Sequence, residues 1–231
     1  LVRSRGLGDV YKRQVRLFSD TGTLDDLGIG QVRDGLGDLM FPGTSTIHAR
    51  PRYFLIIPWI FQRAASKATG TAIVSRANNE ERKLIEVMRT PPAVDGMIGR
   101  LAGKSVQTLP SRIYWAALQR YGILVDPRRH TWDLPIAAPP GFPNQLDGGL
   151  DLTDEEAQFL RERIMVTCPG TYLAYLLADG LHVDADDAVF PWNHLALDSA
   201  PQRLRESVEH ARLVSLAING ATLIYNLLVA E

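Results

Sequence analysis

The chain has 231 residues, of which 45% are hydrophobic and 22% are charged, and its formal net charge at pH 7 is −1. A chain of this length suits one large domain or two small ones and can bury a substantial core, and this composition argues against global disorder. The nearly balanced charge gives no electrostatic signature of binding to nucleic acid or to an anionic membrane. The single cysteine, Cys168, excludes an internal disulfide and favours a reducing compartment, so we expect a cytoplasmic protein with a buried structural thiol.

The first fourteen residues do not read as the start of a folded domain. They contain four basic residues and no apolar stretch, and the run from Gly6 to Gln14 resembles translated sequencing-adaptor DNA. The alternative interpretation is a basic tail that binds an acidic partner. We expect residues 1–14 to be an artefact that takes no part in the fold. Residues 15–231 are expected to form a single helical domain that is truncated at both ends, because the chain stops inside an apolar helical run.

Helical periodicity dominates the first half of the chain. Apolar residues recur at helical spacing over residues 23–40, although four glycines weaken this helix. The run from Tyr53 to Phe61 is too short to span a bilayer and too apolar for a surface strand. We therefore expect a buried helix here, which Pro58 kinks or restarts. A charged helix is expected over residues 79–88.

Caps and helix breakers organise the second half. Ser111 is expected to cap a helix that Gly122 terminates. Residues 125–151 are rich in proline and glycine, which predicts a long irregular connection, either a linker or a functional loop. Thr153 and Glu156 have the spacing of a capping box for a helix that extends to residue 165, and a shorter helix is expected over residues 171–178.

The segment 202–230 has the strongest helical pattern. No charged residue follows Arg212 until Glu231, and an uncharged run of this length reaches the threshold for a transmembrane helix. Four polar residues nevertheless recur at intervals of four, three and four on one helix face. They are Ser215, Asn219, Thr222 and Asn226. Because unpaired amides are costly in lipid, we expect a buried polar stripe in a soluble core and no membrane contact; a membrane span is the alternative.

Strand patterns are sparse throughout the chain. The sequence therefore predicts a mainly α fold with few or no strands. We expect an irregular helical bundle around a buried C-terminal helix, with the apolar segment 53–61 packed close to that helix.

Asp34 and Asp38 are the candidate metal ligands. They are four residues apart, so a helix places both carboxylates on one face. Such a pair can bind a divalent cation or act as acid and base. No third carboxylate or histidine stands at ligand spacing beside them. In the alternative interpretation the carboxylates are solvated or pair with Arg33.

The loop over residues 42–52 is the best candidate for a binding site. Its polar side chains are those of Thr44, Ser45, Thr46, Arg50 and Arg52. Hydroxyls, backbone amides freed by glycine and guanidinium groups suit phosphate oxygens, so we expect phosphate or nucleic acid to bind here. The loop lacks the Gly-Lys-Ser/Thr ending of a Walker loop. In the alternative interpretation the hydroxyls cap the next helix and the arginines pair with acidic neighbours.

No catalytic, metal or cofactor motif is complete. The five histidines are scattered, no serine lies in a Gly-x-Ser-x-Gly elbow, and no dinucleotide fingerprint follows a clear strand. The sequence therefore predicts no cofactor.

Five short motifs of the sequence form a characteristic set: Asp26–Gly30 with Arg33-Asp34, Phe41–Thr46, Arg52–Leu55 with Pro58-Trp59, Pro110-Ser111 with Ile113–Trp115, and Leu223–Asn226. Together they resemble a family of bacterial proteins labelled only as a domain of unknown function, number 6361. The resemblance covers the chain from about Val15 onward. Members of that family carry histidine where Asn219 stands here, so no histidine-based role carries over. The resemblance implies a prokaryotic cytoplasmic protein and supplies no activity, cofactor or catalytic residue.

A sequence so poor in motifs favours a non-enzymatic interaction or accessory protein. We expect a protein partner or nucleic acid, in a prokaryotic DNA-processing or defence assembly, and the sequence leaves the oligomeric state open. The competing hypothesis is a metal-dependent enzyme of phosphoryl transfer or nucleic-acid processing. It would use Asp34 and Asp38 to bind the metal, with Arg50 and Arg52 on phosphate.

Overall fold

The computed structural model describes residues 28–89, 95–178 and 190–230, so the segment 1–14 and the start of the helix predicted from residue 23 lie outside it. The described part is mainly α-helical, as predicted, and its sheet is one short antiparallel pair of strands. Its α-helices are α2 (Ile29–Met40), α3 (Tyr53–Ala65), α4 (Ala72–Met88), α5 (Pro110–Arg120), α6 (Asp154–Thr167), α7 (Tyr172–Leu176) and α8 (Gln202–Ala230). The strands are β1 (Leu124–Asp126) and β2 (Thr131–Trp132), and the 3-10 helices are η1 (Gly103–Ser105), η2 (Pro191–Asn193) and η3 (Leu195–Leu197).

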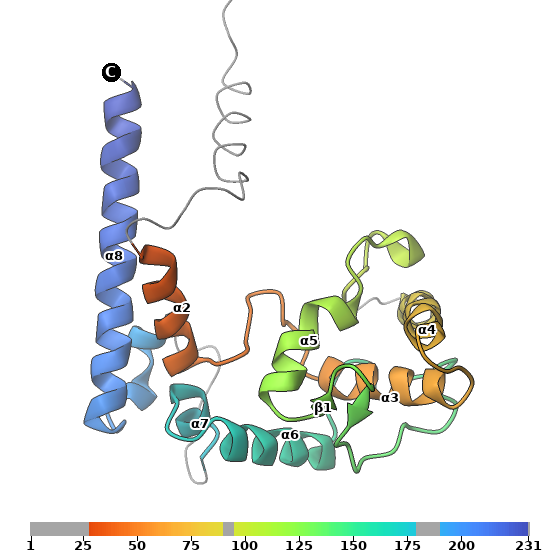
Figure 1. Ribbon diagram of the computed structural model, residues 1–231. Helices are drawn as coiled ribbons and strands as arrows, with labels where there is room; N and C mark the ends of the chain where they lie inside the picture. Colours follow the sequence, from red (N-terminus) through yellow and green to blue (C-terminus); the bar gives the residue numbers. More distant parts are fainter. Residues whose placement is uncertain (1–27, 90–94, 179–189, 231) are drawn as a thin grey trace, which may run out of the picture.

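The elements form two groups (Figure 1). The larger group contains α3, α4, α5 and the β1–β2 hairpin. The smaller group contains α2 and α8, which stand side by side at the other end of the molecule, while α6 runs between the groups. Each group has its own cluster of buried apolar side chains.

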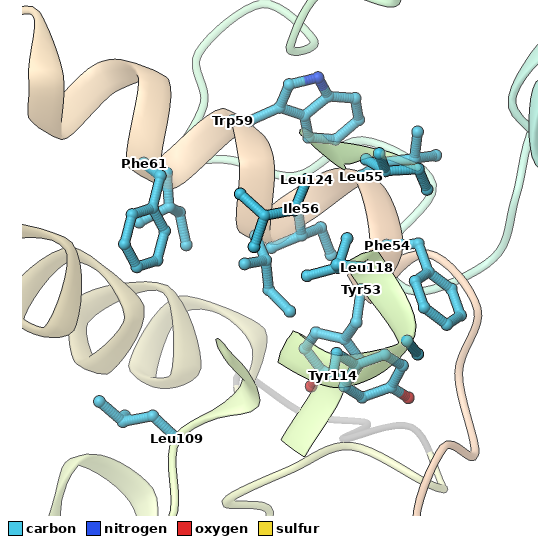
Figure 2. Packing of buried hydrophobic residues seen from close by; sticks show 14 of the residues in the cluster. Tyr53, Phe54, Leu55, Ile56, Trp59, Phe61, Leu109, Tyr114, Leu118 and Leu124 are labelled. Carbon is cyan, nitrogen blue, oxygen red and sulfur yellow. The ribbon is translucent and has the colours of Figure 1, made fainter. Parts of the chain in front are cut away.

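Helix α3 is the centre of the larger cluster, because nearly its whole circumference is apolar. Ten of its thirteen residues are buried, and the helix continues through Pro58 without restarting. Figure 2 shows Tyr53 beside Tyr114 of α5, with Trp59 directed to the other side of the helix. The prediction of a buried helix in this segment is confirmed.

The proline- and glycine-rich stretch packs against α3. The indole N–H of Trp59 donates a hydrogen bond to the carbonyl of Ile136, at 2.8 Å. The ring of Phe142 lies edge-on to Trp59, with ring centroids 5.6 Å apart. These contacts hold the stretch on the core, so that it contributes packing and hydrogen bonds.

Helix α8 has the predicted limits but not the predicted burial. Leu204, Val208 and Ala211, at its base, are buried, and the first two belong to the smaller cluster. Beyond Arg212 most of its large apolar side chains are exposed. The prediction of a bundle built around a buried C-terminal helix was therefore wrong, as was its packing against the segment 53–61. Hydropathy shows that a helix favours apolar surroundings, but it does not show which element supplies them.

Of the two predicted helix N-caps, the structure confirms that of α6 and contradicts that of α5. The capping box of α6 is confirmed, since the Thr153 side chain accepts from the Glu156 N–H and the Glu156 carboxylate accepts from the Thr153 N–H. The predicted cap on α5 was wrong, because Leu109 is its N-cap and makes no side-chain capping bond. The hydroxyl of Ser111 instead donates to the carboxylate of Glu81 on α4. A carboxylate from another helix has thus replaced the expected local cap.

Candidate functional site

The loop over residues 42–52 lies against α5. His48 hydrogen-bonds through Nε2 to the carbonyl of Ile113 at 2.9 Å, and its ring stacks on Tyr114 with centroids 4.3 Å apart. The Tyr114 hydroxyl donates to the carbonyl of Arg50 at 3.0 Å. Burial raises the pKa of Tyr114 to about 12, so this hydroxyl stays protonated as a donor at neutral pH. The loop is therefore a fixed connection between the two groups of elements.

Arg52 is a buried structural residue. Its Nη2 lies 2.9 Å from Oε1 of Glu156, and the side chains of the two residues are 2% and 5% exposed. Its Nη1 donates to the carbonyls of Asp147 and Gly149, at 2.6 and 2.8 Å. This close approach needs a glycine at 148, where φ is +73° and a Cβ would lie 3.1 Å from Nη1. Arg52 therefore has no guanidinium edge to offer a phosphate, and its assignment to the predicted phosphate site was wrong.

Arg50 is partly exposed but engaged. Its Nε donates to the carbonyl of Asp95 at 2.7 Å, and its Nη1 pairs with Asp151 at 3.2 Å. The alternative interpretation, in which both arginines pair with acidic residues, is confirmed. The sequence missed the partners because Arg52 and Glu156 are 104 positions apart.

The hydroxyl residues of this loop do not cap α3. Thr44, Ser45 and Thr46 are all exposed, and the N-cap of α3 receives no side-chain hydrogen bond. The Thr44 hydroxyl donates to the carbonyl of Phe41 at 2.8 Å. A role for these hydroxyls in phosphate binding stays a prediction, without the arginine that was expected to complete the site.

The carboxylates of Asp34 and Asp38 lie exposed on α2. Asp34 pairs with Arg33 at 2.8 Å, as in the alternative interpretation. Among the described residues, no group of three histidine, cysteine, aspartate or glutamate side chains is placed to hold a metal ion. The described structure therefore adds no third ligand to the predicted pair.

The polar stripe of α8 is not buried. Ser215 is half-buried, whereas Asn219, Thr222 and Asn226 are exposed, and this part of the prediction was wrong. The stripe continues, at helical spacing, the face through which Leu204 and Val208 pack at the base of the helix. The face that anchors α8 thus changes from apolar to polar as the helix leaves the domain.

Beyond Arg212, α8 exposes apolar side chains around most of its circumference. One side, which we call the α8 apolar face, consists of Leu213, Leu216, Leu223 and Leu227, each between 49% and 70% exposed. Exposed apolar side chains on the other sides are those of Ile218, Ile224, Tyr225, Leu228 and Val229. Figure 1 shows this half of the helix extending past α2. The helix is long and apolar enough to cross a membrane, and none of its most apolar stretch is buried. Contiguous exposed apolar surface of this kind marks interaction sites.

A cavity of about 200 Å³ lies between α3, α4, α5 and the hairpin, and we call it the aromatic pocket. Its lining residues are Phe61, Val74, Asn78, Ser111, Arg112, Trp115 and His130. His130 stacks on Phe61 with centroids 5.3 Å apart, and Trp115 meets His130 edge-on at 6.0 Å. Sequence analysis did not find this pocket, because its rings come from three elements and share no motif or spacing.

Glu81 of α4 bonds to Ser111, which lines the pocket at the start of α5. Its Oε1 accepts from the Ser111 N–H at 2.7 Å and its Oε2 accepts from the Ser111 hydroxyl at 2.8 Å. Burial raises the pKa of this carboxyl to about 7, against the lowering effect of the two hydrogen bonds from Ser111. The carboxyl therefore changes charge near neutral pH while it anchors α4 to α5.

Comparison with protein families matches residues 10–231 to a family that is described only as one of unknown function. No curated protein and no solved structure matches the chain.

Proposed function

Because this chain belongs to DUF6361, a family of unknown function, its family brings no activity with it, and we propose that it is a non-enzymatic assembly protein. It associates with a second copy of itself through the α8 apolar face. The exposed leucines of that face carry the proposal, since water is a poor solvent for side chains that lie 49–70% open to it. Fully burying one such leucine contributes about 1.5–3 kcal/mol.

The spacing on α8 favours another helix as the occupant. Leu213, Leu216, Gly220, Leu223 and Leu227 follow one another at intervals of three, four, three and four. This is the spacing of the contact positions in a two-helix coiled coil. No other atom lies within 4 Å of a Cβ built on Gly220, so a second helix can approach closely there. A second copy supplies an identical face, which suits symmetric association.

The polar stripe argues against lipid. Asn219 and Asn226 lie in the middle of the uncharged run, where hydrocarbon offers no hydrogen-bond partner. Neighbouring helices of a protein assembly can bond these amides. Length and composition alone also fit a membrane span, so the experiment must separate the two.

We expect the full chain to sediment as a dimer and the double variant Leu216→Glu plus Leu223→Glu to sediment as a monomer. Two carboxylates per chain at the contact should weaken association at least about a hundredfold, because a buried, unpaired charge is strongly disfavoured. Sedimentation equilibrium over a concentration series measures this change.

The matched control is Ile218→Glu plus Tyr225→Glu. These residues are also seven positions apart and exposed, but they point to the other side of α8. The control should remain dimeric. A monomeric wild type, or equal loss of association in both double variants, contradicts the proposal. Flotation of the wild type with neutral phosphatidylcholine vesicles, lost in both variants, would overturn it in favour of membrane insertion.

The competing enzyme hypothesis gains no specific observation from the described residues. Arg52 is committed to Glu156, and Asp34 is committed to Arg33. The expected setting, a prokaryotic DNA-processing or defence assembly, stays a prediction beside the proposal of self-assembly.

A further inference from the structure

The aromatic pocket lies in the larger group of elements, away from α8, and does not depend on the proposed self-association. Phe61 forms its floor and is only 2% exposed, whereas Trp115 and His130 are half-buried walls. The rings of Trp115 and His130 stand at 70° to each other, so they present a face and an edge to anything that enters. This arrangement suits a flat ring, which stacks on one wall and meets the other edge-on.

Of the polar side chains that line the pocket, Ser111 is bonded to Glu81, and the other three make no hydrogen bond within the described structure. The amide of Asn78, the guanidinium of Arg112 and the imidazole of His130 form no hydrogen bond or ion pair with any described residue. By contrast, Arg52 is fully occupied by carbonyls and a carboxylate, and Arg50 bonds to the Asp95 carbonyl and the Asp151 carboxylate. An amide reads the edge of a base and a guanidinium binds phosphate oxygens, so the free groups match the parts of a nucleotide.

The backbone holds His130 in place before any ligand arrives. His130 is the non-glycine residue with a positive φ, +52°, among those described. This left-handed conformation is unfavourable for a residue with a side chain, although histidine adopts it more readily than most. It places the imidazole on Phe61 at the hairpin turn. A wall fixed in this way loses little conformational entropy when a ring stacks on it.

The size of the pocket limits what it accepts. A cavity of about 200 Å³ is smaller than the usual site for a whole drug-sized ligand and fits one ring system. The rest of the ligand must remain outside, where Arg112 is exposed. Two further arginines, Arg128 and Arg129, are exposed in the hairpin turn next to His130, and Arg129 pairs there with Asp126.

We propose that the aromatic pocket binds a nucleotide, with the base packed against the rings of Trp115 and His130 on the side that faces the pocket and the phosphate on Arg112. Asn78 hydrogen-bonds the edge of the base. The nucleotide is either free or one unit of a single strand, since both present the same base and phosphate. Stacking of a base on aromatic side chains tolerates any base, because every base has a flat ring face.

The test is quenching of tryptophan fluorescence in the full chain on titration with adenosine monophosphate, adenosine and ribose 5-phosphate. We expect saturable quenching by the monophosphate, weaker binding of adenosine and no quenching by the sugar phosphate. Trp115→Phe should abolish most of the quenching because it keeps a ring but removes the reporting indole. Absence of saturable quenching by the monophosphate would overturn the proposal.

Arg112→Gln provides the specific readout. It should weaken binding of the monophosphate at least about tenfold and leave adenosine unchanged, so that the two ligands bind alike. The matched control is Arg120→Gln, an exposed arginine on the same helix that does not line the pocket. It should bind like the wild type. An unchanged preference for the monophosphate in Arg112→Gln, or the same loss in Arg120→Gln, would contradict the proposal.

A final titration with single-stranded decanucleotides of DNA and RNA identifies the source of the nucleotide. Tighter binding than the monophosphate, with a steep dependence on salt, supports a strand. Equal or weaker binding supports a free nucleotide. In either case, Trp115→Phe and Arg112→Gln should reduce the quenching and the binding of the decanucleotides as they do for the monophosphate.

Discussion

Arg52→Ala is expected to lower the free energy of unfolding by about 3–5 kcal/mol, measured by urea denaturation at neutral pH. The substitution removes a buried guanidinium whose partners are Glu156 and two backbone carbonyls. It leaves the Glu156 carboxylate without its opposite charge in a position where the side chain is 5% exposed. Breaking a buried pair in this way is far more costly than the pair's net contribution, because an uncompensated charge stays behind.

Two further variants test this explanation. Arg50→Ala removes an ion pair in which Asp151 is 78% exposed, and it should cost about 1 kcal/mol or less. Arg52→Lys keeps the charge but loses the planar guanidinium that reaches the carboxylate and both carbonyls. Its loss of unfolding free energy should therefore lie between those of Arg50→Ala and Arg52→Ala. A loss for Arg52→Ala no larger than that for Arg50→Ala would show that burial of this pair does not govern the stability of the fold.

Glu81→Gln is expected to remove a pH-dependent part of the stability. The pKa of the folded Glu81 carboxyl is raised by burial to about 7 from an ordinary value of 4.5. Between these pH values the folded state holds the proton more tightly than the unfolded state does. This contribution to stability is therefore complete below about pH 4.5 and is lost as the pH rises through about 7. Its size is on the order of 3 kcal/mol.

The measurement is the free energy of unfolding at several pH values between 4.5 and 8, with wild type and variant compared at each. The glutamine can still accept from the Ser111 N–H and donate to its hydroxyl, so the variant should fold. Its stability advantage over the wild type should grow as the pH rises. Glu86→Gln is the control on the same helix, since the Lys104 N–H and Arg89 lower the pKa of the Glu86 carboxyl. A constant difference between Glu81→Gln and wild type would contradict the assignment.

Much of the helical structure was determined by local sequence. The apolar run around Tyr53 and Phe61 forms a buried helix because such a segment has no polar face to present to water. Thr153 and Glu156 begin α6 because two side chains three residues apart satisfy each other's backbone N–H groups. Segment 202–230 forms one helix with the predicted limits. Each of these outcomes depends on residues within a few positions of one another, which the sequence displays directly.

The tertiary structure alone decided how those helices are used. Arg52 is a structural residue because folding brings it to Glu156, 104 positions away. The sequence alone had suggested a free cation at Arg52 and only a helix cap at Glu156. Helix α8 exposes an apolar face because no described element covers that face beyond Arg212. The aromatic pocket exists because α3, α5 and the hairpin converge there. Periodicity and caps follow from local chain geometry, whereas partners, burial and pockets depend on long-range packing that no local pattern records.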